Sequence, residues 1–407
     1  MRKECAGRVA KKAHLAAGLD IGSVWTRMVV VTLEEGQVRY RAHAAAPSRG
    51  WRRGQIADQA SVAEAVTQVV REAEARAGAQ IDGAVVGVGG PSVRSQQGRG
   101  LYEFGRRRSV EQGDIVYAIE LAARARLDED RYLLQVLPQD FTVDGRPPIP
   151  HPLNVECERL EAHALLVTAS AQEHQALVSA VNQGHLRLDE TVFEAMAAGY
   201  ASVLPEERAG GVAVIDIGGQ STNVAFYDGD SMLCALGLPI SGDHFTRDLG
   251  ELKALSFEEA ERLKFAHGCA LLGLTADNIV IELPAEAGRP GREISRRDLI
   301  EILEARAGQL YELVERCRVR FAREMALREG VVLCGGGSLL EGMVEMAEKV
   351  LGCPARLGFA RGIQGWPDAL QTPVWTTAAG LAMYSARLQV RKAKQTGPSI
   401  LSLFTGK

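Results

Sequence analysis

The stretch Gly18-Leu19-Asp20-Ile21-Gly22-Ser23 returns about half the chain later as Ile215-Asp216-Ile217-Gly218-Gly219-Gln220-Ser221-Thr222. An apolar run stands before and after each copy. A strand, a turn rich in glycine and hydroxyl residues and a second strand indicate a β-hairpin. Two such hairpins in one chain predict two related lobes.

Both hairpin turns carry groups that suit phosphate, because a tight turn exposes backbone N–H groups and hydroxyls. Each turn also has an aspartate at its edge, and a carboxylate there suits a hydrated Mg²⁺, which keeps most of its waters. Either turn alone could be no more than a tight turn. The candidate ligand residues are Asp20, Gly22 and Ser23 in the first copy, and Asp216, Gly218, Gly219, Gln220, Ser221 and Thr222 in the second.

Two further segments could complete a nucleotide site. Gly335, Gly336, Gly337 and Ser338 follow the apolar run 331–334, where glycines allow close backbone approach and a following helix would offer free N–H groups. Glu261 and Lys264 are three residues apart on an expected helix, where they could hydrogen-bond a ribose or simply form a solvated ion pair. No GxxxxGK[ST] motif is present, which excludes a P-loop protein.

Composition excludes several classes of protein. The 407 residues suggest about two to three domain-sized units. A net charge of −4 argues against a general nucleic-acid binder. The seven cysteines form no CxxC pair, which favours a reducing cytoplasm over a disulfide framework or a zinc site. The sequence has no run of 18 consecutive apolar residues, so we expect no membrane-spanning helix.

Strands and helices alternate along the chain, which predicts α/β layers. The residue composition changes between the buried strand expected at 84–88 and the strand expected at 161–169. A basic run at 106–108, a helix near 110–125 and a proline-rich turn at 146–152 indicate an inserted subdomain. Apolar spacing predicts the other helices at 61–77, 171–182, 257–266, 296–324, 339–351 and 377–392.

The two phosphate hairpins, the Glu-x-x-Lys helix and the Gly-Gly-Gly-Ser turn together resemble the actin-like ATPase superfamily. The chain from about residue 15 to 387 resembles one branch of it, the FtsA family of bacterial cell-division proteins. The most specific signal is the insert segment Val136–Gly145. Other segments similar to this family are 89–95 with 98–100, 114–125, 240–246 and 299–306.

The resemblance implies an α/β, two-lobed actin-like ATPase fold with an FtsA-type 1C subdomain inserted in the first lobe. The implied second lobe has a core, 2A, and an insert, 2B. A tail would follow the first-lobe core. The implied boundaries are 14–88, 163–208 and 372–395 for 1A, 89–162 for 1C, 209–245 and 310–371 for 2A, 246–309 for 2B, and 396–407 for the tail.

The resemblance also implies a function. Family members bind ATP and Mg²⁺ and polymerise on the cytoplasmic face of the membrane at the division site. They bind the C-terminal tail of the tubulin-like protein FtsZ and recruit later division proteins of the membrane, and no nucleic acid is involved. The FtsZ tail docks on the 2B helix, which could otherwise be an ordinary charged face; its residues here are Arg297, Glu301, Glu304 and Arg306.

Three positions depart from the family pattern around the phosphates. Trp25 stands where a lysine is usual, so a cation is lost unless Arg27 replaces it, and Gln220 and Asn223 stand where glycine and aspartate are usual. Glu194 is the candidate for orienting the attacking water, although it could only favour a helix N-terminus. We therefore expect ATP binding with at most slow hydrolysis.

The C-terminal stretch 387–407 has five basic residues and no acidic one. The apolar residues Ile400, Leu401, Leu403 and Phe404 would fall on one side of a short helix. Such a tail resembles the family's membrane-targeting amphipathic helix, although it could be a disordered end. It is too short to be a stable free helix, so we expect weak membrane binding by a monomer and stronger binding by a polymer.

Two other functions share this fold. A PilM-like scaffold of type IV pilus machines would have the nucleotide turns but not the segment 137–145 or a membrane tail. A small-molecule kinase would need a general-base aspartate facing its acceptor, and no motif nominates one.

Overall fold

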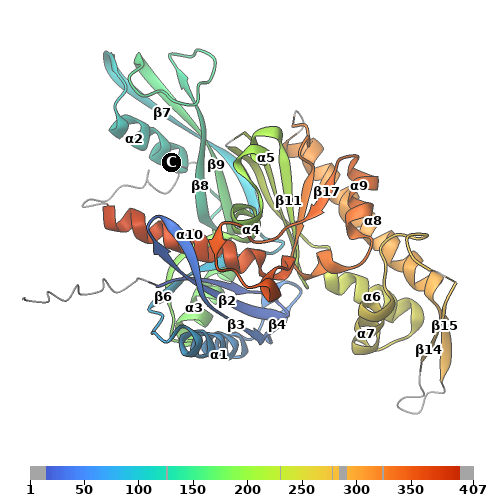
Figure 1. Cartoon of the computed structure of the whole chain (residues 1–407). Coiled ribbons are helices and arrows are strands. Elements are labelled where there is room, and N and C mark those ends of the chain that lie inside the picture. Colours follow the sequence, from blue (N-terminus) through green and yellow to red (C-terminus); the bar gives the residue numbers. More distant parts are fainter. Residues whose placement is uncertain are drawn as a thin grey trace, which may run out of the picture.

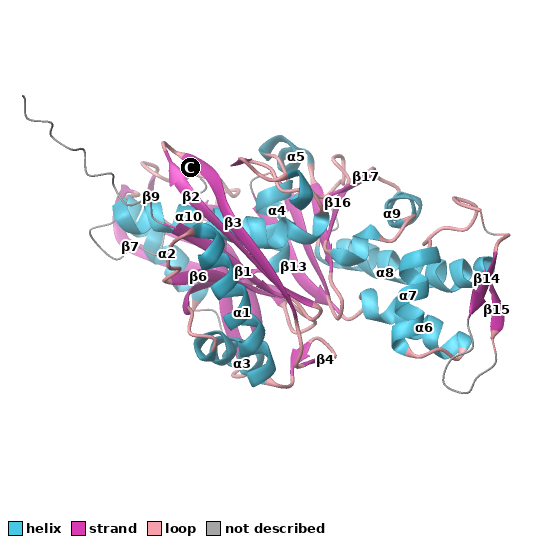
Figure 2. Cartoon of the chain, turned by 60° about the horizontal axis from the view of Figure 1, so that its bottom comes forward, coloured by secondary structure: helices cyan, strands magenta, loops and turns pink. Residues whose placement is uncertain are grey.

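The structure, a computed structural model, describes residues 15–124, 127–229, 231–276, 278–283, 291–322 and 325–394. It has two lobes, each built on a central sheet, and a smaller sheet with one helix that projects from the first lobe (Figure 1). At the far end of the second lobe lie two helices and a short hairpin, which give the molecule its elongated outline (Figure 2).

The first lobe is built on a sheet in the order β10-β6-β1-β2-β3-β18. β2 runs antiparallel to its neighbours β1 and β3, whereas β6 and β10 run in the same direction as β1. The strands are β1 (Leu15–Ile21), β2 (Trp25–Glu34), β3 (Gln37–Pro47), β6 (Gly83–Val88), β10 (Arg187–Phe193) and β18 (Ile363–Gln364). A small hairpin, β4 (Trp51–Arg52) and β5 (Gln55–Ile56), follows β3.

Helices cover both faces of this sheet. Because both faces are covered, β1 is buried from Ala16 to Ile21 and β6 along its whole length, and neither strand alternates between apolar and polar residues; Asp20 is the one charged residue in them. The helices α1 (Gln59–Ala77) and α3 (Ala171–Gln183) pack on one face, and α4 (Glu194–Ser202) and α10 (Thr376–Lys394) pack on the other.

The second lobe repeats the first. Its sheet has the order β13-β12-β11-β16-β17, and each pair of neighbours has the same relative direction as in β3-β2-β1-β6-β10. The duplicated phrase therefore marks a duplicated sheet. The strands are β11 (Val212–Ile217), β12 (Thr222–Asp228), β13 (Ser231–Leu238), β16 (Val331–Cys334) and β17 (Ala355–Leu357); α5 (Pro205–Gly210) precedes them.

The outer part of the second lobe is mainly helical. α7 begins with a capping box in which Ser256 and Glu259 satisfy each other's backbone N–H groups. α8 spans 26 residues, about 39 Å at 1.5 Å per residue, and buries one apolar stripe. The elements are α6 (Gly242–Lys253), α7 (Phe257–His267), β14 (Val280–Leu283), β15 (Arg292–Ser295), α8 (Arg296–Phe321) and α9 (Met343–Leu351).

The projecting insert is a sheet in the order β7-β9-β8 with α2 (Gln112–Ala123) packed on it. Its strands are β7 (Arg94–Ser109), β8 (Arg131–Val143) and β9 (Glu156–Ser170). Along β9, Leu160, Ala162 and Ala164 enter the core of the insert, whereas Leu165, Val167 and Ala169 enter the core of the first lobe. Since one strand serves both cores, the sheet of the insert continues past residue 162.

The predicted helices are present, with ends shifted by a few residues, and one of them begins clearly later than predicted. The helix expected at 339–351 begins only at Met343, because Gly342 takes a left-handed conformation and a 3₁₀ turn, η1 (Gly336–Leu339), precedes it. The helices α5 and α6 were not predicted. Within the described residues, no helix has the length and apolar character needed to cross a membrane.

Candidate functional site

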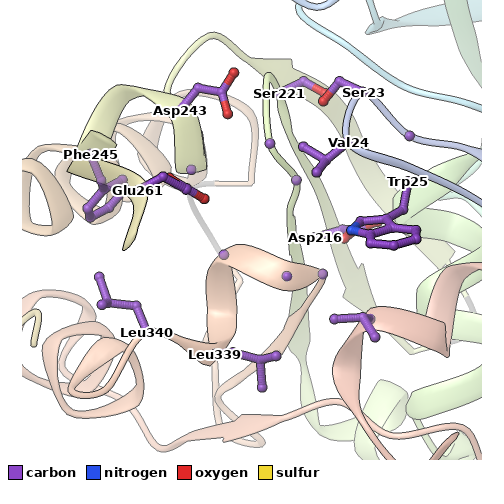
Figure 3. A pocket seen from close by; sticks show the side chains of 18 of the residues that line it. Ser23, Val24, Trp25, Asp216, Ser221, Asp243, Phe245, Glu261, Leu339 and Leu340 are labelled. Atoms are coloured by element: carbon purple, nitrogen blue, oxygen red, sulfur yellow. The ribbon is translucent and has the colours of Figure 1, made fainter. Parts of the chain in front are cut away.

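A cavity of about 500 Å³ lies between the two lobes. Figure 3 shows Ser23, Val24 and Trp25 on one side, Phe245 and Glu261 on the opposite side, and Leu339 and Leu340 along another wall. The segments that line it are far apart in sequence. The predicted residues that line it are Asp20, Gly22, Ser23, Glu194, Asp216, Gly218, Gly219, Ser221, Glu261, Lys264, Gly335, Gly336 and Gly337.

The two hairpin turns have the same backbone geometry. The Gly22 N–H donates to the carbonyl of Trp25 at 3.1 Å, and the Gly218 N–H donates to the carbonyl of Ser221 at 2.9 Å. A Cβ on Gly22 would lie 2.8 Å from the carbonyl oxygen of Trp25, and a Cβ on Gly218 would lie 3.0 Å from that of Ser221. Both turns thus present small, polar backbone to the cavity, the surface that an anion such as phosphate requires.

Three carboxyl groups, those of Asp20, Asp216 and Glu194, line the cavity near the two hairpin turns. Asp20 and Asp216 are the next-to-last residues of β1 and β11, and Glu194 is the first residue of α4. Burial, together with the nearby Asp216 and against the effect of Arg27, raises the pKa of Asp20 to about 7. Burial and the two aspartates raise the pKa of Glu194 well above its usual value, and burial raises that of Asp216.

Burial is the main cause of these raised pKa values, and the nearby positive charge of Arg27 does not offset its effect on Asp20 and Asp216. Among the described residues, six carboxylates but only three basic side chains line the cavity. In the same part of the chain, no group of three histidine, cysteine or acidic side chains could ligate a metal ion directly. A hydrated divalent cation held through its waters by Asp20 and Asp216 fits both observations, and it would also offset the charge of a polyphosphate.

Arg27 places a cation in the cavity although Trp25 replaces the expected lysine. Arg27 stands directly opposite Asp20 in the β1–β2 pair, and it lines the cavity. Burial lowers its pKa, whereas Asp20 and Asp216 act in the opposite direction. From the sequence, Arg27 was only a possible substitute for the lysine. The strand register shows how it can act as one, because it places Arg27 beside Asp20 at the cavity.

Glu261 and Lys264 form an ion pair, with 2.7 Å between Oε2 and Nζ. Lys264 Nζ also donates to the Thr246 hydroxyl at 2.7 Å and to the carbonyl of Gly242 at 3.2 Å, and Thr246 donates to Glu261. The pair is thus fixed against α6 and lines the cavity. It is more than a solvated surface pair.

The glycine turn after β16 is closely packed against the second hairpin. Gly335 has a φ of 77°, and a Cβ there would lie 2.4 Å from Asp216 Oδ1. A Cβ on Gly337 would lie 2.4 Å from a side-chain carbon of Ile217. These glycines leave room for a ligand beside the carboxyl cluster, a place that a larger residue would fill.

Three predicted ligand residues do not line the cavity. The Thr222 hydroxyl donates to the carbonyl of Ile240 at 2.6 Å, and the Ser338 hydroxyl donates to the carbonyl of Gly335 at 2.7 Å. Both are buried and hold the backbone of their turns. Gln220 does not line the cavity; its side-chain Oε1 accepts a hydrogen bond from the Gly54 N–H of the first lobe, and its side chain also hydrogen-bonds Asp243.

Other residues of the site were not predicted. The Thr377 hydroxyl, at the start of α10, donates to Asp216 at 2.8 Å. Asp243 lines the cavity, and its backbone N–H donates to the carbonyl of Gly219 at 2.7 Å. The sequence indicated only that the segment 240–246 is similar to the FtsA family. In the structure this segment lies beside the second hairpin turn, to which it is hydrogen-bonded.

The four residues predicted to dock a partner peptide do not share one face of α8. Arg297 and Glu301 form an exposed ion pair, with 3.1 Å between Nε and Oε1. Glu304 accepts hydrogen bonds from Leu272 N–H and from Lys349, and Arg306 makes a two-pronged ion pair with Asp248. The predicted membrane residues Ile400, Leu401, Leu403 and Phe404 lie outside the described residues.

Solved structures share this architecture. A PilM–PilN type IV pilus biogenesis complex aligns with a TM-score of 0.65 at 19% identity, covering 91% of this chain and 98% of the other. MreB5 of Spiroplasma citri bound to ADP aligns with a TM-score of 0.55 at 13% identity, covering 94% and 99%. These likenesses confirm the predicted two-lobed actin-like ATPase fold.

Comparison of sequences is more specific. A family model described as "Cell division protein FtsA" matches residues 213–380, and one described as "SHS2 domain inserted in FTSA" matches residues 90–168. Cell division protein FtsA of Pseudomonas aeruginosa is 31% identical over 93% of this chain and 91% of its own length. FtsA of Escherichia coli K12 is 29% identical over 92% and 91%. The chain belongs to the FtsA family of cell division proteins.

Proposed function

We propose that the cavity binds ATP together with Mg²⁺. The observation that carries this proposal is the pair of matching hairpin turns, one from each lobe, that face a single cavity with a carboxyl cluster beside them. The phosphates would lie between Ser23 and Ser221, and Asp20 and Asp216 would hold the hydrated cation. Glu261 and Lys264 would contact the ribose, and Gly335–Gly337 would border the base.

ATP binding would serve assembly more than catalysis. In this proposal Glu194 would orient a water molecule, and Asn223 Nδ2 donates to its Oε2 at 2.7 Å. This bond occupies one of the acceptor sites of the carboxylate and makes it less basic, which disfavours proton uptake from a water molecule. The proposed activity is therefore ATP binding with slow hydrolysis at most.

In the cell, we propose that the chain polymerises on the cytoplasmic face of the membrane at the division site. It would tether FtsZ filaments there and recruit later division proteins of the membrane. FtsA-family membership supports this role, as does the insert, which matches the model described as "SHS2 domain inserted in FTSA". In this proposal, residues 89–162 form 1C, 246–309 form 2B and 396–407 form the membrane tail. The segments 14–88, 163–208 and 372–395 form 1A, and 209–245 with 310–371 form 2A.

The FtsZ tail would dock on the outer part of the second lobe at the start of α8. Arg297 and Glu301 are about half exposed there and can exchange their mutual ion pair for contacts with a peptide. Glu304 and Arg306 would act by holding α8 against α6 and α9. Replacing Glu301 with arginine is expected to weaken binding of an FtsZ-tail peptide by about tenfold, the loss of one charge-assisted contact.

Fluorescence anisotropy with a labelled FtsZ-tail peptide measures this effect. Glu312 is the matched control, because it is an exposed glutamate on the same helix and Glu312→Arg should leave the affinity unchanged. Equal losses in both variants would show only a general charge effect. No binding of the peptide to the full-length protein at high concentration would overturn the tethering role.

Deleting residues 396–407 is expected to abolish co-sedimentation with anionic vesicles, because the deletion removes the apolar residues that would enter the membrane surface. ATP binding, measured in the same preparation, should not change, since the cavity lies among other residues. Vesicles without anionic lipid provide the control for the basic residues. Unchanged sedimentation of the truncated protein would refute the anchor.

A further inference from the structure

The two lobes meet at a tightly packed junction next to the phosphate turns. First-lobe groups come from the turn of the β4–β5 hairpin, at Gly54, and from the Gly90-Pro91 loop that leads into the insert. Second-lobe groups come from the second hairpin and from β13. A Cβ on Gly237 would lie 1.7 Å from the carbonyl oxygen of Gly90, so the two backbones are in direct contact.

Gln220 spans this junction from the second lobe. Its Oε1 accepts a hydrogen bond from the Gly54 N–H at 2.9 Å, and its own N–H donates to the Ser23 hydroxyl at 3.1 Å. Gly54 has a φ of 76°, which favours glycine, and its Cβ position is bordered by Pro91 at 3.2 Å and the Gln220 carbonyl at 3.3 Å. A glycine at position 220 would have no side chain to reach Gly54.

Asn223 makes a second bridge. It is only 2% exposed, its Oδ1 accepts from the Gly90 N–H at 2.9 Å, and its Nδ2 donates to Glu194 Oε2 at 2.7 Å. Both partners belong to the first lobe. Because the amide is buried, separating the lobes would leave a donor and an acceptor without partners unless water entered. Two further bonds from Gly237 N–H and Ala235 N–H to Val93 and Ser95 tie β13 to the base of the insert.

We propose that Gln220 and Asn223 are positioning residues that form a latch between the lobes and thereby set the selectivity between ATP and ADP. Every bond of this latch joins one protein group to another, so the terminal phosphate of ATP is not needed to close the cleft. A ligand changes a conformational equilibrium only as far as it favours one state over the other. The protein should therefore bind ADP and ATP with similar affinity. This inference rests on the nucleotide binding proposed above.

The test compares Gln220→Met, which keeps the size of the side chain but removes the acceptor for Gly54, with the unaltered full-length protein. Asn223→Leu removes both bonds of the second bridge, and Gln68→Met, on the exposed face of α1, is the matched control. Calorimetry with Mg²⁺ gives the dissociation constants of ATP and ADP. Hydrogen exchange of peptides that contain Gly54 or Gly90 reports lobe opening without any nucleotide.

For the unaltered protein and the Gln68 variant, the two dissociation constants are expected to agree within about threefold. In Gln220→Met the ADP affinity should fall about tenfold more than the ATP affinity, because only ATP can then supply the missing bridge. Exchange at Gly54 should also become faster. An unchanged ratio of affinities together with unchanged exchange in both junction variants would overturn the latch. Failure of the unaltered protein to bind either nucleotide would refute the proposed function, and the exchange data would still decide whether the latch exists.

Discussion

Asp216→Asn is expected to weaken the binding of Mg–ATP by about 30- to 150-fold, or about 2–3 kcal/mol, the range for a lost charge-assisted contact. Asp216 sits at the end of β11 with its carboxyl group buried, and it is one of two aspartates placed to hold a hydrated cation. Asparagine keeps the shape and can still hydrogen-bond Thr377, but it removes the charge that the cation needs. Isothermal calorimetry with ATP and excess Mg²⁺ measures the change.

Stability separates this effect from simple damage to the fold. Burial disfavours the ionised form of Asp216, so removing its charge should leave the melting temperature of the nucleotide-free protein unchanged or higher. Asp228→Asn is the matched control, because Asp228 ends β12 at the exposed edge of the same hairpin. Retention of full Mg–ATP affinity in Asp216→Asn would show that the carboxyl cluster does not hold the cation.

Gly335→Ala is expected to destabilise the second lobe by about 2–4 kcal/mol. Its φ of 77° and ψ of 169° lie in a region that only glycine occupies readily, which alone costs about 1–3 kcal/mol. A methyl group would also collide with Asp216 Oδ1 and the Ile217 carbonyl, at 2.4 and 2.5 Å. Denaturant unfolding followed by circular dichroism measures the loss.

Gly336→Ala provides a control one residue away. The nearest atom to a Cβ at Gly336 is a side-chain carbon of Val374 at 3.9 Å, an ordinary contact. This substitution should therefore leave the unfolding free energy within about 0.5 kcal/mol. If both alanine variants unfolded at the same denaturant concentration, the close packing of Gly335 against the second hairpin would be contradicted.

The duplicated sheet could be predicted from sequence because its signals are local. Each copy of the Asp-x-Gly phrase lies between apolar runs, and both hairpins, with their matching turns, follow from that pattern. The Glu261–Lys264 pair likewise depends only on helical spacing. These parts need no knowledge of the rest of the chain.

The parts that could not be predicted depend on contacts between distant segments. Thr377 reaches Asp216 from a helix 161 positions later, and Gln220 reaches Gly54 across 166 positions. Their local patterns show only a helix start and a turn. The late start of α9 depends on the left-handed Gly342, which an apolar periodicity does not reveal. The sequence predicted that Glu304 and Arg306 contact a partner peptide. It could not show that they form ion pairs with Lys349 and Asp248, because these partners lie on other helices.

The central claim is that two hairpin turns, one from each lobe, grip the phosphates of one Mg-bound nucleotide. Calorimetric titration of the full-length protein with ATP, in Mg²⁺ and again in EDTA, tests it most directly. The account predicts one ATP per chain in Mg²⁺ and an affinity at least about tenfold lower in EDTA, because six carboxylates then face an uncompensated polyphosphate. Equal affinity with and without Mg²⁺, or no binding in either buffer, would contradict it.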